Sequence, residues 1–401
     1  TNTPADYHED ALPVQLPQAG GRNEPAWPPA RPIRRSRTKD RDRVASVPAG
    51  FYNAGMAEET NAQWRLRSRP VGRVAESDFE LVREPIPKLG EGQVHVRNLY
   101  LAFEPAMRGW LNDVPSYIPP VGLGEVMRAS TVGQVVESRN PEFEVGRMVS
   151  GMLGWQEHVV TDGKPGPMGG LTRVPEGLPP ELMLSALGGT GLTAYFGMTE
   201  IGEVKEGDTV LVSGAAGATG SVAAQIARLR GAAKVVGLAG GPRKCAWLID
   251  EAGLDAAIDY KSENLLSRLR EEFPDGISLF FDNVGGPVLN DALLRMAWFG
   301  RVVLCGGISA YNEEELPPGP SNYMQIVIRR LTVKGFILFD HISKARTAID
   351  ELSKWLAEGK LKHAEDIQEG FEKAPSTLLR LFEGKNLGKQ LLKIADPVIP
   401  D

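Results

Sequence analysis

The sequence predicts a two-domain α/β protein, in which a β-rich domain precedes a doubly wound parallel sheet. Three observations lead to this prediction: a length of 401 residues, strand-like runs before Pro175, and alternating strand-like and helix-like runs after it. At about 150 residues per domain, this length supplies two hydrophobic cores. We expect an extension over 1–55, the β-rich domain over 56–180, the parallel-sheet domain over 181–345, and a segment over 346–401 that completes the first domain.

The extension over 1–55 differs from the rest of the chain in composition. It holds eight prolines, few large aliphatic side chains, and a run of arginines between Arg31 and Arg43. Such a segment cannot bury enough apolar surface to offset the entropy lost on ordering. We therefore expect it to be disordered, with Met56 as the natural beginning of the fold. The alternative is a basic arm that binds an anionic partner.

Short strands are expected between Gln63 and Pro175, where Pro and Gly punctuate the sequence. Val94 and Val96, and then Leu99 and Leu101, alternate with other residues as in half-buried strands. This pattern predicts a small barrel-like β domain.

Buried parallel strands are expected after Pro175, because short apolar runs there alternate with helical stretches. Right-handed helical crossovers between such strands produce a doubly wound sheet. The runs cover residues 208–214, 233–240, 256–260, 278–284, 300–307 and 331–338. An amphipathic helix and a final apolar run lie between Ser343 and Lys393, and we expect this tail to return to the first domain and close a cleft.

The composition excludes several classes of function. Lys and Arg total 45 against 51 Asp and Glu, so no chain-wide basic face is expected to bind nucleic acid. Only Cys245 and Cys305 are present, which excludes a disulfide framework and a four-thiolate zinc site and fits a reducing cytoplasm. The longest uncharged stretch, 209–227, lacks the hydrophobicity of a membrane span, and no export signal is apparent, so we expect a cytoplasmic protein.

A glycine-rich segment follows the first predicted parallel strand. Gly214, Gly217 and Gly220 lie between that strand and a helix. This spacing allows a tight turn, leaves no Cβ where a pyrophosphate approaches, and directs helix N–H groups at the anion. A dinucleotide site is therefore predicted, with a Gly/Ala-rich packing turn as the alternative.

The cofactor preference is expected at the end of the second parallel strand. NAD enzymes usually place a carboxylate there to bind the ribose 2′-hydroxyl, whereas this chain has Gly240 and Gly241 followed by Arg243 and Lys244. Two cations suit a 2′-phosphate, so we predict NADP(H) rather than NAD(H). The alternative is a solvated helix start, although a helix N-terminus does not favour cations.

No metal site is predicted. No cysteine precedes position 245, and the histidines are scattered at positions 8, 95, 158, 341 and 363. A G-x-S-x-G nucleophile elbow is also missing. A carbonyl substrate is therefore expected to be polarised without a Lewis acid.

Ten motifs, taken in order, resemble one family, the zinc-independent medium-chain dehydrogenase/reductases, in the branch of prostaglandin reductases, plant alkenal double-bond reductases and bacterial curcumin reductases. The resemblance runs from about Met56 to the C-terminus. The motifs are EPAMRGW (104–110), SYIPPVGLGEVMR (116–128), LTAYFG (192–197), AAGATGS (215–221), GGPRKC (240–245), IDYKS (258–262), DNVGG (282–286), GGISAYN (306–312), LTVKGF (331–336) and FEGKNLGK (382–389). It implies a GroES-like β domain, a Rossmann domain, and NADPH-dependent reduction of the C=C bond of α,β-unsaturated ketones and aldehydes.

The resemblance also implies a set of cofactor-binding residues. Lys244 and Tyr260 match residues that hold the adenosine 2′-phosphate, and Asn283 and Asn386 match other cofactor contacts. For each Asn, a turn or helix-capping role is the alternative. The complete expected set is Gly214, Gly217, Ala218, Thr219, Gly220, Gly240, Arg243, Lys244, Tyr260, Asn283, Gly307 and Asn386.

Two tyrosines are the expected catalytic residues. Tyr311 matches the tyrosine near the substrate carbonyl in these reductases, and its phenol can donate a hydrogen bond to a forming enolate oxygen. The alternative is a loop tyrosine anchored to backbone. Tyr117 is a second pocket residue or, beside Pro119 and Pro120, a rigid lid contact.

One motif departs from the family. Many members have a tyrosine within DPYMR, where this chain has Ala106 between Pro105 and Met107. Substrate preference therefore cannot be transferred from those members. We interpret the neighbouring Arg108 as an interdomain or cofactor-side contact.

The function implied is that of an NADPH-dependent 2-alkenal/2-alkenone reductase acting on a small-molecule enone or enal. Two alternatives remain: a quinone reductase of the same superfamily, and an NADPH-binding scaffold or sensor without turnover. The family also implies a homodimer, for which the apolar run LTVKGFIL at residues 331–338 would supply a sheet edge.

Overall fold

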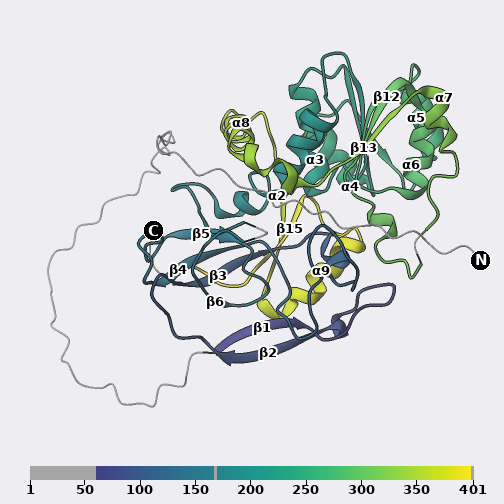
Figure 1. The fold of residues 1–401 in the computed structure, drawn as a ribbon. Coiled ribbons are helices and arrows are strands. Elements are labelled where there is room, and N and C mark those ends of the chain that lie inside the picture. The colour runs from purple at the N-terminus through teal and green to yellow at the C-terminus, as the bar shows by residue number, and fades with distance from the viewer. Residues whose placement is uncertain (1–59, 167–168, 316, 399–401) are drawn as a thin grey trace, which may run out of the picture. The chain divides into compact units, whose positions relative to one another are not determined.

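The computed structural model describes residues 60–166, 169–315 and 317–398. It confirms the predicted fold: a β-rich region is followed by a parallel sheet covered by helices (Figure 1). The extension predicted over 1–55 lies outside the described residues. No helix in the described ranges is long and apolar enough to span a membrane.

The β-rich domain is organised around β3 (Val94–Ala102), which pairs antiparallel with strands on both sides. The other strands of this first-domain sheet are β4 (Thr131–Ser138), β5 (Met148–Gly151), β6 (His158–Thr161) and β7 (Thr172–Arg173). A separate antiparallel pair consists of β1 (Thr60–Leu66) and β2 (Phe79–Pro85). Up to β7, the predicted small β domain is thus built from antiparallel strands in two sheets, and the larger sheet also includes two strands of the C-terminal segment.

A β-bulge explains the broken alternation in β3. The register with β4 shifts between Asn98 and Tyr100, so one extra residue is accommodated there. Val94 and Val96 precede the shift and Leu99 and Leu101 follow it, and all four side chains are buried. The change from even to odd apolar positions in the sequence therefore reflects the bulge.

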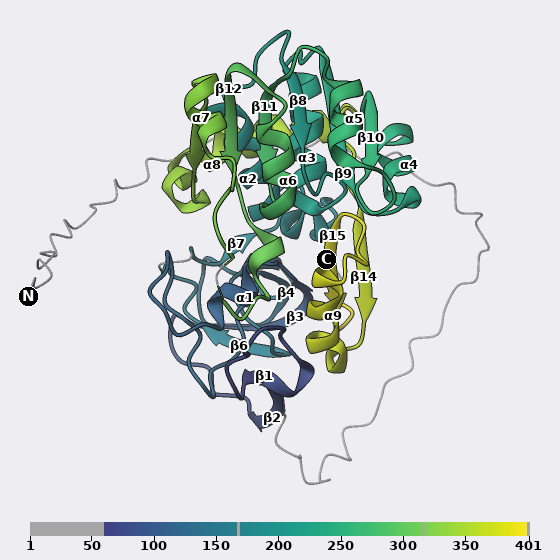
Figure 2. The same cartoon turned by 90° about the vertical axis from the view of Figure 1, so that its right-hand side faces the viewer.

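The parallel-sheet domain has strands in the order β10-β9-β8-β11-β12-β13, all parallel (Figure 2). The strands are β8 (Thr209–Val212), β9 (Lys234–Ala239), β10 (Ala256–Asp259), β11 (Ile277–Asp282), β12 (Met296–Leu304) and β13 (Thr332–Gly335). The order reverses between β8 and β11. Ligands of such sheets bind in the crevice outside the carboxyl ends of the strands at this reversal.

Alternate residues of the parallel strands face different helices. Val210 and Val212 of β8 belong to a core cluster shared with α3 and α8, whereas Leu211 belongs to a cluster shared with α5 and α6. These helices are α3 (Ala218–Leu229), α5 (Leu265–Glu272), α6 (Gly286–Leu293) and α8 (Ala345–Ala357). Both faces of the sheet are covered, which is why the strands are almost continuously apolar.

Four further α-helices belong to the two domains. They are α1 (Met107–Trp110), α2 (Gly189–Phe196), α4 (Pro242–Asp250) and α7 (Met324–Arg329). Helix α4 follows β9 and α7 precedes β13, as expected for crossovers in a doubly wound sheet.

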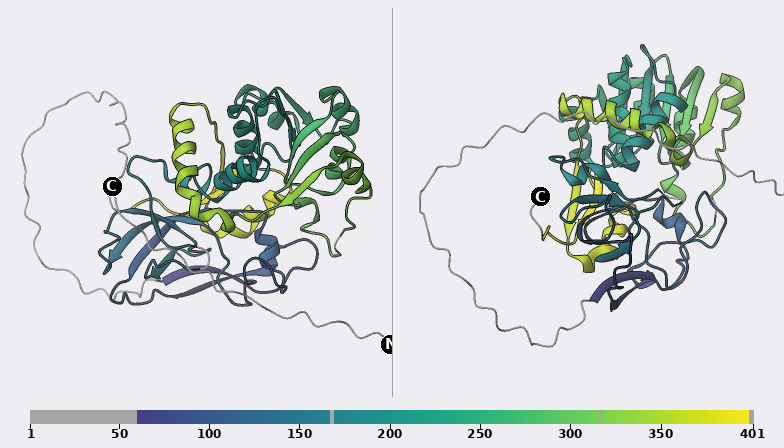
Figure 3. Two further views of the ribbon diagram at one scale, coloured as in Figure 1. Left: turned by 45° about the horizontal axis from the view of Figure 1, so that its top comes forward. Right: turned by 60° about the vertical axis from the view of Figure 1, so that its left-hand side comes forward.

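The C-terminal segment divides between the two domains. Helix α8 packs through Ala348, Leu352 and Trp355 on the core beneath α3. The return to the first domain is made by β14 (Glu365–Glu369), α9 (Ala374–Phe382) and β15 (Lys389–Lys393). β15 pairs antiparallel with β3 and parallel with β14. Figure 3 shows the yellow C-terminal end of the chain beside the blue strands of the β-rich domain. The final apolar run thus returns to the first domain as predicted, whereas the amphipathic helix predicted for the same tail, α8, packs on the parallel-sheet core instead.

Candidate functional site

The glycine-rich turn joins β8 to α3 as the sequence predicts. Gly214 has a φ of +58°, a conformation that favours glycine, and the N–H of Gly217 donates to the Gly214 carbonyl over 2.9 Å. A Cβ on Gly220 would lie 2.3 Å from the same carbonyl oxygen, so no side chain fits there. Ala218 and Thr219 begin α3, and the first N–H groups of a helix lack intrahelical acceptors. These free donors suit an anion.

The C-terminal segment is bonded directly to this turn. The N–H of Gly388 donates to the Ala216 carbonyl over 2.8 Å, and Gly388 forms an isolated parallel bridge with Gly217. Gly388 has a φ of +68°, and a Cβ there would lie 1.9 Å from the Ala364 carbonyl oxygen. The turn is therefore held from both sides, by its own helix and by the loop that precedes β15.

Asn386 stabilises that loop. Its side-chain nitrogen donates to the Gly388 carbonyl over 2.8 Å. This bond favours the turn role that the sequence left open for Asn386. The residue still lies beside the glycine-rich turn, because Gly388 contacts Gly217.

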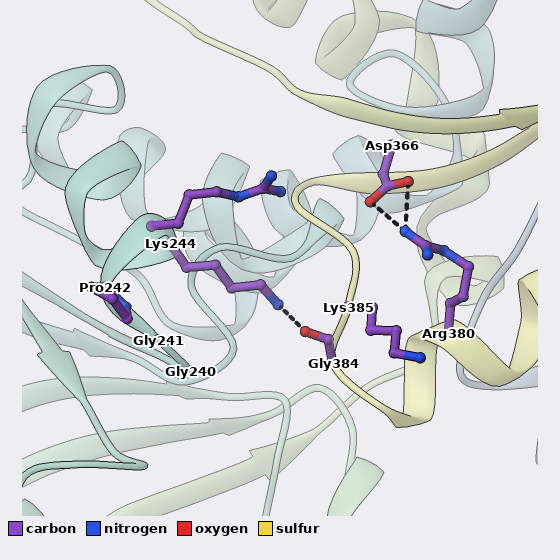
Figure 4. Close-up of a pocket in the computed structure, with 9 residues that line it drawn as sticks. Gly240, Gly241, Pro242, Lys244, Asp366, Arg380, Gly384 and Lys385 are labelled. Atoms are coloured by element: carbon purple, nitrogen blue, oxygen red, sulfur yellow. Dashed lines mark hydrogen bonds and ion pairs between the residues drawn. The ribbon is translucent and has the colours of Figure 1, made fainter.

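A cavity of about 330 Å³ lies between the start of α4 and the C-terminal segment (Figure 4). We call it the cation pocket. It is lined by Gly240, Gly241, Pro242, Arg243, Lys244, Asp366, Arg380, Gly384 and Lys385. The Lys244 Nζ donates to the Gly384 carbonyl over 2.8 Å. Burial lowers the pKa of Lys244, and the positive charges of Lys261 and Arg243 lower it further.

Positive charge exceeds negative charge in the cation pocket. Arg380 is paired with Asp366 at 3.0 Å and Lys385 with Glu383 at 2.6 Å. The side chains of Arg243 and Lys261, by contrast, form no hydrogen bond or ion pair with any other described residue. Unpaired cations beside a partly desolvated lysine form a site that a phosphate group would stabilise.

Tyr260 and Lys261 approach the cation pocket from the end of β10. A Cβ on Gly240 would lie 2.8 Å from Lys261 Cε and 3.0 Å from Tyr260 Oη. Gly240 thus allows both side chains to lie against the backbone at the start of α4. Gly241 has a φ of +100°, and its N–H donates to Asp259 Oδ1 over 2.8 Å, which fixes the turn.

The ends of β8 and β11 are joined by a buried polar network. Asp282 accepts hydrogen bonds from the Ser213 hydroxyl at 2.7 Å and from the Val284 N–H at 2.9 Å, while burial raises its pKa. The Asn283 side-chain nitrogen donates to the Ser213 carbonyl over 2.7 Å. Asn283 is therefore positioned at the strand reversal, with its side-chain oxygen left to accept from a ligand.

Tyr311 follows a short 3-10 turn, η4 (Ile308–Ala310), after β12. Its Oη accepts a hydrogen bond from the Gly307 N–H over 3.3 Å. The tyrosine is thus anchored to backbone, but its phenol oxygen is the acceptor of this hydrogen bond and not the donor. The hydroxyl proton has no acceptor among the described residues and is available to donate. Burial is the main cause that raises the pKa of Tyr311, so the phenol stays neutral around pH 7.

Tyr117, the second predicted tyrosine, belongs to the first domain. The Trp110 Nε1–H donates to Tyr117 Oη over 2.9 Å. Burial raises the pKa of Tyr117, and the charges of Glu104 and of an ionised Tyr311 raise it further. The structure therefore brings the two predicted tyrosines within electrostatic range of each other.

A second cavity, of about 510 Å³, lies beside Tyr311. We call it the apolar cleft, and it is lined by Leu304, Cys305, Gly306, Gly335, Phe336, Ile337 and Asp340. A Cβ on Gly306 would lie 3.2 Å from Tyr311 Oη, so the phenol lies against this wall. Burial raises the pKa of Cys305 to about 12, which makes its thiol a poor nucleophile.

The interpretation of Arg108 is wrong. Its guanidinium is buried and donates to the Gly72 and Pro70 carbonyls and to Asn112 Oδ1, all within the first domain. Arg108 fixes the loop around Gly72. A Cβ on Gly72 would lie 3.0 Å from Glu314 Cγ, so it is this loop that meets the other domain.

Sequence reasoning missed the residues that reach the site from distant parts of the chain. Arg380, Lys385 and Gly388 come from the C-terminal segment, and Lys261 directly follows the predicted Tyr260. The GKNLGK motif was the available signal for the C-terminal contribution. Within 60–166, 169–315 and 317–398, no group of three or more His, Cys, Asp or Glu side chains is placed to hold a metal ion.

Comparisons with known proteins agree with this architecture. Residues 62–166 match the family described as N-terminal domain of oxidoreductase, and residues 218–354 match the family described as zinc-binding dehydrogenase. The chain is 37% identical over 346 residues to NADPH-dependent curcumin reductase of Escherichia coli (strain K12), covering 85% of this chain and 99% of that protein. It is 41% identical over 337 residues to prostaglandin reductase 1 of Bos taurus, covering 82% and 98%. The crystal structure of CurA in complex with NADPH from Vibrio vulnificus superimposes with a TM-score of 0.79 at 38% identity, covering 84% of this chain and 100% of that one.

Proposed function

The chain belongs to the zinc-independent medium-chain dehydrogenase/reductases, and we propose that it is an NADPH-dependent reductase of the C=C bond of α,β-unsaturated ketones and aldehydes. The observation that carries the proposal is the neutral phenol of Tyr311, whose proton is free to donate beside the apolar cleft. The names of the relatives, which include NADPH-dependent curcumin reductase and prostaglandin reductase 1, agree with it.

The described residues fit NADPH in two places. The glycine-rich turn leaves room for a pyrophosphate, because a side chain at Gly220 would collide with the Gly214 carbonyl. The cation pocket suits the 2′-phosphate, because Arg243 and Lys261 are unpaired and Lys244 is already partly desolvated. When bound, the cofactor supplies a hydride.

The chain's own residues stabilise the charge that the reduction creates. Addition of a hydride to the β-carbon of an enone moves an electron pair to the carbonyl oxygen, which becomes an enolate. The Tyr311 hydroxyl donates to that oxygen, while the Gly307 N–H holds the phenol from its other side. Tyr117, held by Trp110, is a second donor of the same kind. Solvent then protonates the α-carbon and completes the saturated product.

The test is NADPH oxidation by the purified chain, run in parallel with NADH. The substrates are a simple alkenone, an aryl enone and a small quinone. We expect turnover of at least one enone, with NADPH strongly preferred, and a product saturated at the C=C bond. Turnover of the quinone alone would favour a quinone reductase, and cofactor binding without turnover would favour a scaffold or sensor. Either result would refute the proposal.

We also propose that two copies of the chain associate through the edge of the parallel sheet. β13 is the strand at one end of that sheet. Among the described strands, it pairs with β12 alone. Exposed apolar side chains belong to the two elements next to β13, namely its partner β12 and the preceding helix α7 with its N-cap. They are Trp298, Phe299, Tyr323, Met324, Val327 and Ile328. An unpaired strand edge with adjacent apolar surface favours pairing across a two-fold axis.

Light scattering tests this association. We expect twice the 43.5 kDa of one chain for the unaltered protein, and one chain for Val327→Asp. A monomeric unaltered protein would refute the proposal.

We further propose a cytoplasmic location, because Cys245 and Cys305 are both unpaired thiols.

A further inference from the structure

One aromatic side chain of the parallel-sheet domain packs into the core of the other domain. Phe339 lies in η5 (Leu338–Lys344), the segment that follows the edge strand β13. Its neighbour Leu338 packs on the core of the parallel-sheet domain, as the position of η5 in the chain suggests. Phe339 instead packs, partly buried, against the first-domain cluster that contains Trp110 and Ile118. A side chain of one domain thus forms part of the apolar wall of the other.

Phe339 contacts the predicted site through Tyr117. The centroids of the two rings are 6.3 Å apart and their planes are inclined at 44°, which is an aromatic pair. Tyr117 is in turn fixed by its hydrogen bond from Trp110. Phe339, Tyr117 and Trp110 therefore form a continuous aromatic row across the domain boundary.

Residues close to Phe339 in the sequence line the apolar cleft. Ile337 and Asp340, which flank Phe339 in the sequence, both line the cleft. On another side the cleft is lined by Gly306, against which Tyr311 Oη lies. Because Phe339 contacts Tyr117, its ring is the surface that we expect a substituent to meet if it extends from an enone at Tyr311 toward Tyr117.

Ala106 adds to the argument from the other domain. It packs, partly buried, against the same first-domain cluster as Phe339. With only a methyl group at position 106, the first domain contributes little bulk there, and Phe339 of the parallel-sheet domain adds a second aromatic side chain beside Tyr117, after Trp110.

We propose that Phe339 is a specificity-determining residue of the enone site, which selects substrates with a flat conjugated substituent by packing against it beside Tyr117. This inference rests on the proposed reductase function. A flat ring gains both apolar burial and an aromatic contact from this wall, whereas a short alkyl group does not reach it.

The experiment compares two enones that differ only in this substituent, 3-buten-2-one and 4-phenyl-3-buten-2-one. In Phe339→Ala, we expect kcat/KM for the phenyl substrate to fall about tenfold and that for the small substrate to change less than twofold. Phe339→Leu, which keeps apolar volume but removes the ring, should give an intermediate loss for the phenyl substrate. Binding of the saturated product 4-phenyl-2-butanone, measured by calorimetry, should weaken in the same order.

Phe382→Ala is the matched control. Phe382 is also a partly buried aromatic on the first-domain cluster, but it makes no ring contact with Tyr117. We expect it to leave the ratio of the two kcat/KM values unchanged. An equal loss for both enones in Phe339→Ala, or no loss for either, would refute the inference while the reductase function stands. Absence of enone turnover in the unaltered chain would refute the proposed function itself.

Discussion

The cation pocket and the apolar cleft are both lined by loops of the parallel-sheet domain but recognise a ligand in different ways. The cation pocket is lined by Arg243 and Lys244, and Lys261 lies against the backbone of Gly240 beside them. The apolar cleft contains little charge, and its reactive neighbour is the neutral phenol of Tyr311. Charge therefore selects and holds a ligand at one end, whereas desolvation and a single polar donor serve chemistry at the other.

The two regions also differ in how they join the domains. At the cation pocket, Lys244 is bonded to the Gly384 carbonyl of the C-terminal segment. At the apolar cleft, the domains meet through the ring contact between Phe339 and Tyr117. Substitutions in the cation pocket should therefore change cofactor affinity, and substitutions at the apolar cleft should change the turnover rate.

Tyr311→Phe should have the largest effect. Removal of one donor to a developing oxyanion lowers kcat by about 10²–10³. Because Tyr311 is remote from the cation pocket, we expect the dissociation constant of NADPH to change less than twofold. Steady-state kinetics and fluorescence titration measure the two quantities. Unchanged kcat, or a cofactor affinity that falls in parallel, would break the distinction between the two regions.

Lys244→Ala should have a smaller effect, and it should weaken cofactor binding while leaving kcat unchanged. Loss of one charge-assisted hydrogen bond to a 2′-phosphate weakens NADPH binding by about 10- to 100-fold. Affinity for NADH, which lacks that phosphate, should hardly change, nor should kcat at saturating NADPH. Added salt should reduce the difference between the variant and the unaltered chain. Lys354→Ala, at the end of α8 and outside the pocket, is the control. Equal weakening of both cofactors would contradict the assignment.

The smallest effect is expected where the C-terminal segment begins its return. His363 Nδ1 lies 2.9 Å from Glu365 Oε1, and Glu365 also accepts from the Ser185 hydroxyl at 2.7 Å. The hydrogen bond to Glu365 raises the pKa of His363. The bonds from His363 and Ser185 lower the pKa of Glu365 despite its burial.

Each shift defines one side of a pH window. The contribution of His363 to the free energy of unfolding is complete below the pKa of an unfolded histidine. It is lost as the pH rises through the raised pKa of the folded state. That of Glu365 is present above its unfolded pKa and is lost as the pH falls through its lowered folded pKa. Because His363 is partly exposed, the pair should contribute about 0.5 kcal/mol. Melting temperatures of the unaltered chain and His363→Gln should therefore differ near pH 5.5 and converge by pH 9. A constant difference would refute the linkage.

Local sequence predicted the parts of the site that depend on backbone conformation. Gly214 and Gly220 occupy positions where φ or contact distance excludes a side chain, and such requirements appear as glycine at fixed spacing. Arg243 and Lys244 were also predicted from local sequence, because the residues that distinguish NADP(H) from NAD(H) come directly after β9. The alternation of β3 was interpreted correctly as a strand, but the bulge within it was not predicted.

Long-range contacts could not be predicted in the same way. Phe339 of η5 reaches the first-domain cluster, and Arg380 of α9 reaches the cation pocket, only through contacts between the two domains. No periodicity in their segments indicates these contacts. Arg108 shows the converse. A conspicuous arginine in a family motif turned out to satisfy carbonyl groups of a nearby loop, because a buried guanidinium must find several acceptors.

The pairing of β15 with β3 constrains how the chain folds during its synthesis. Residues Tyr100–Ala102 of β3 acquire their partner from Leu391–Lys393, almost three hundred positions later. Until residues 388–393 have left the ribosome, this part of β3 presents an unpaired edge, and the glycine-rich turn lacks its bond from Gly388. The β-rich domain is thus completed only after the parallel-sheet domain has been synthesised, and the edge of β3 stays open to wrong strand pairing throughout that time.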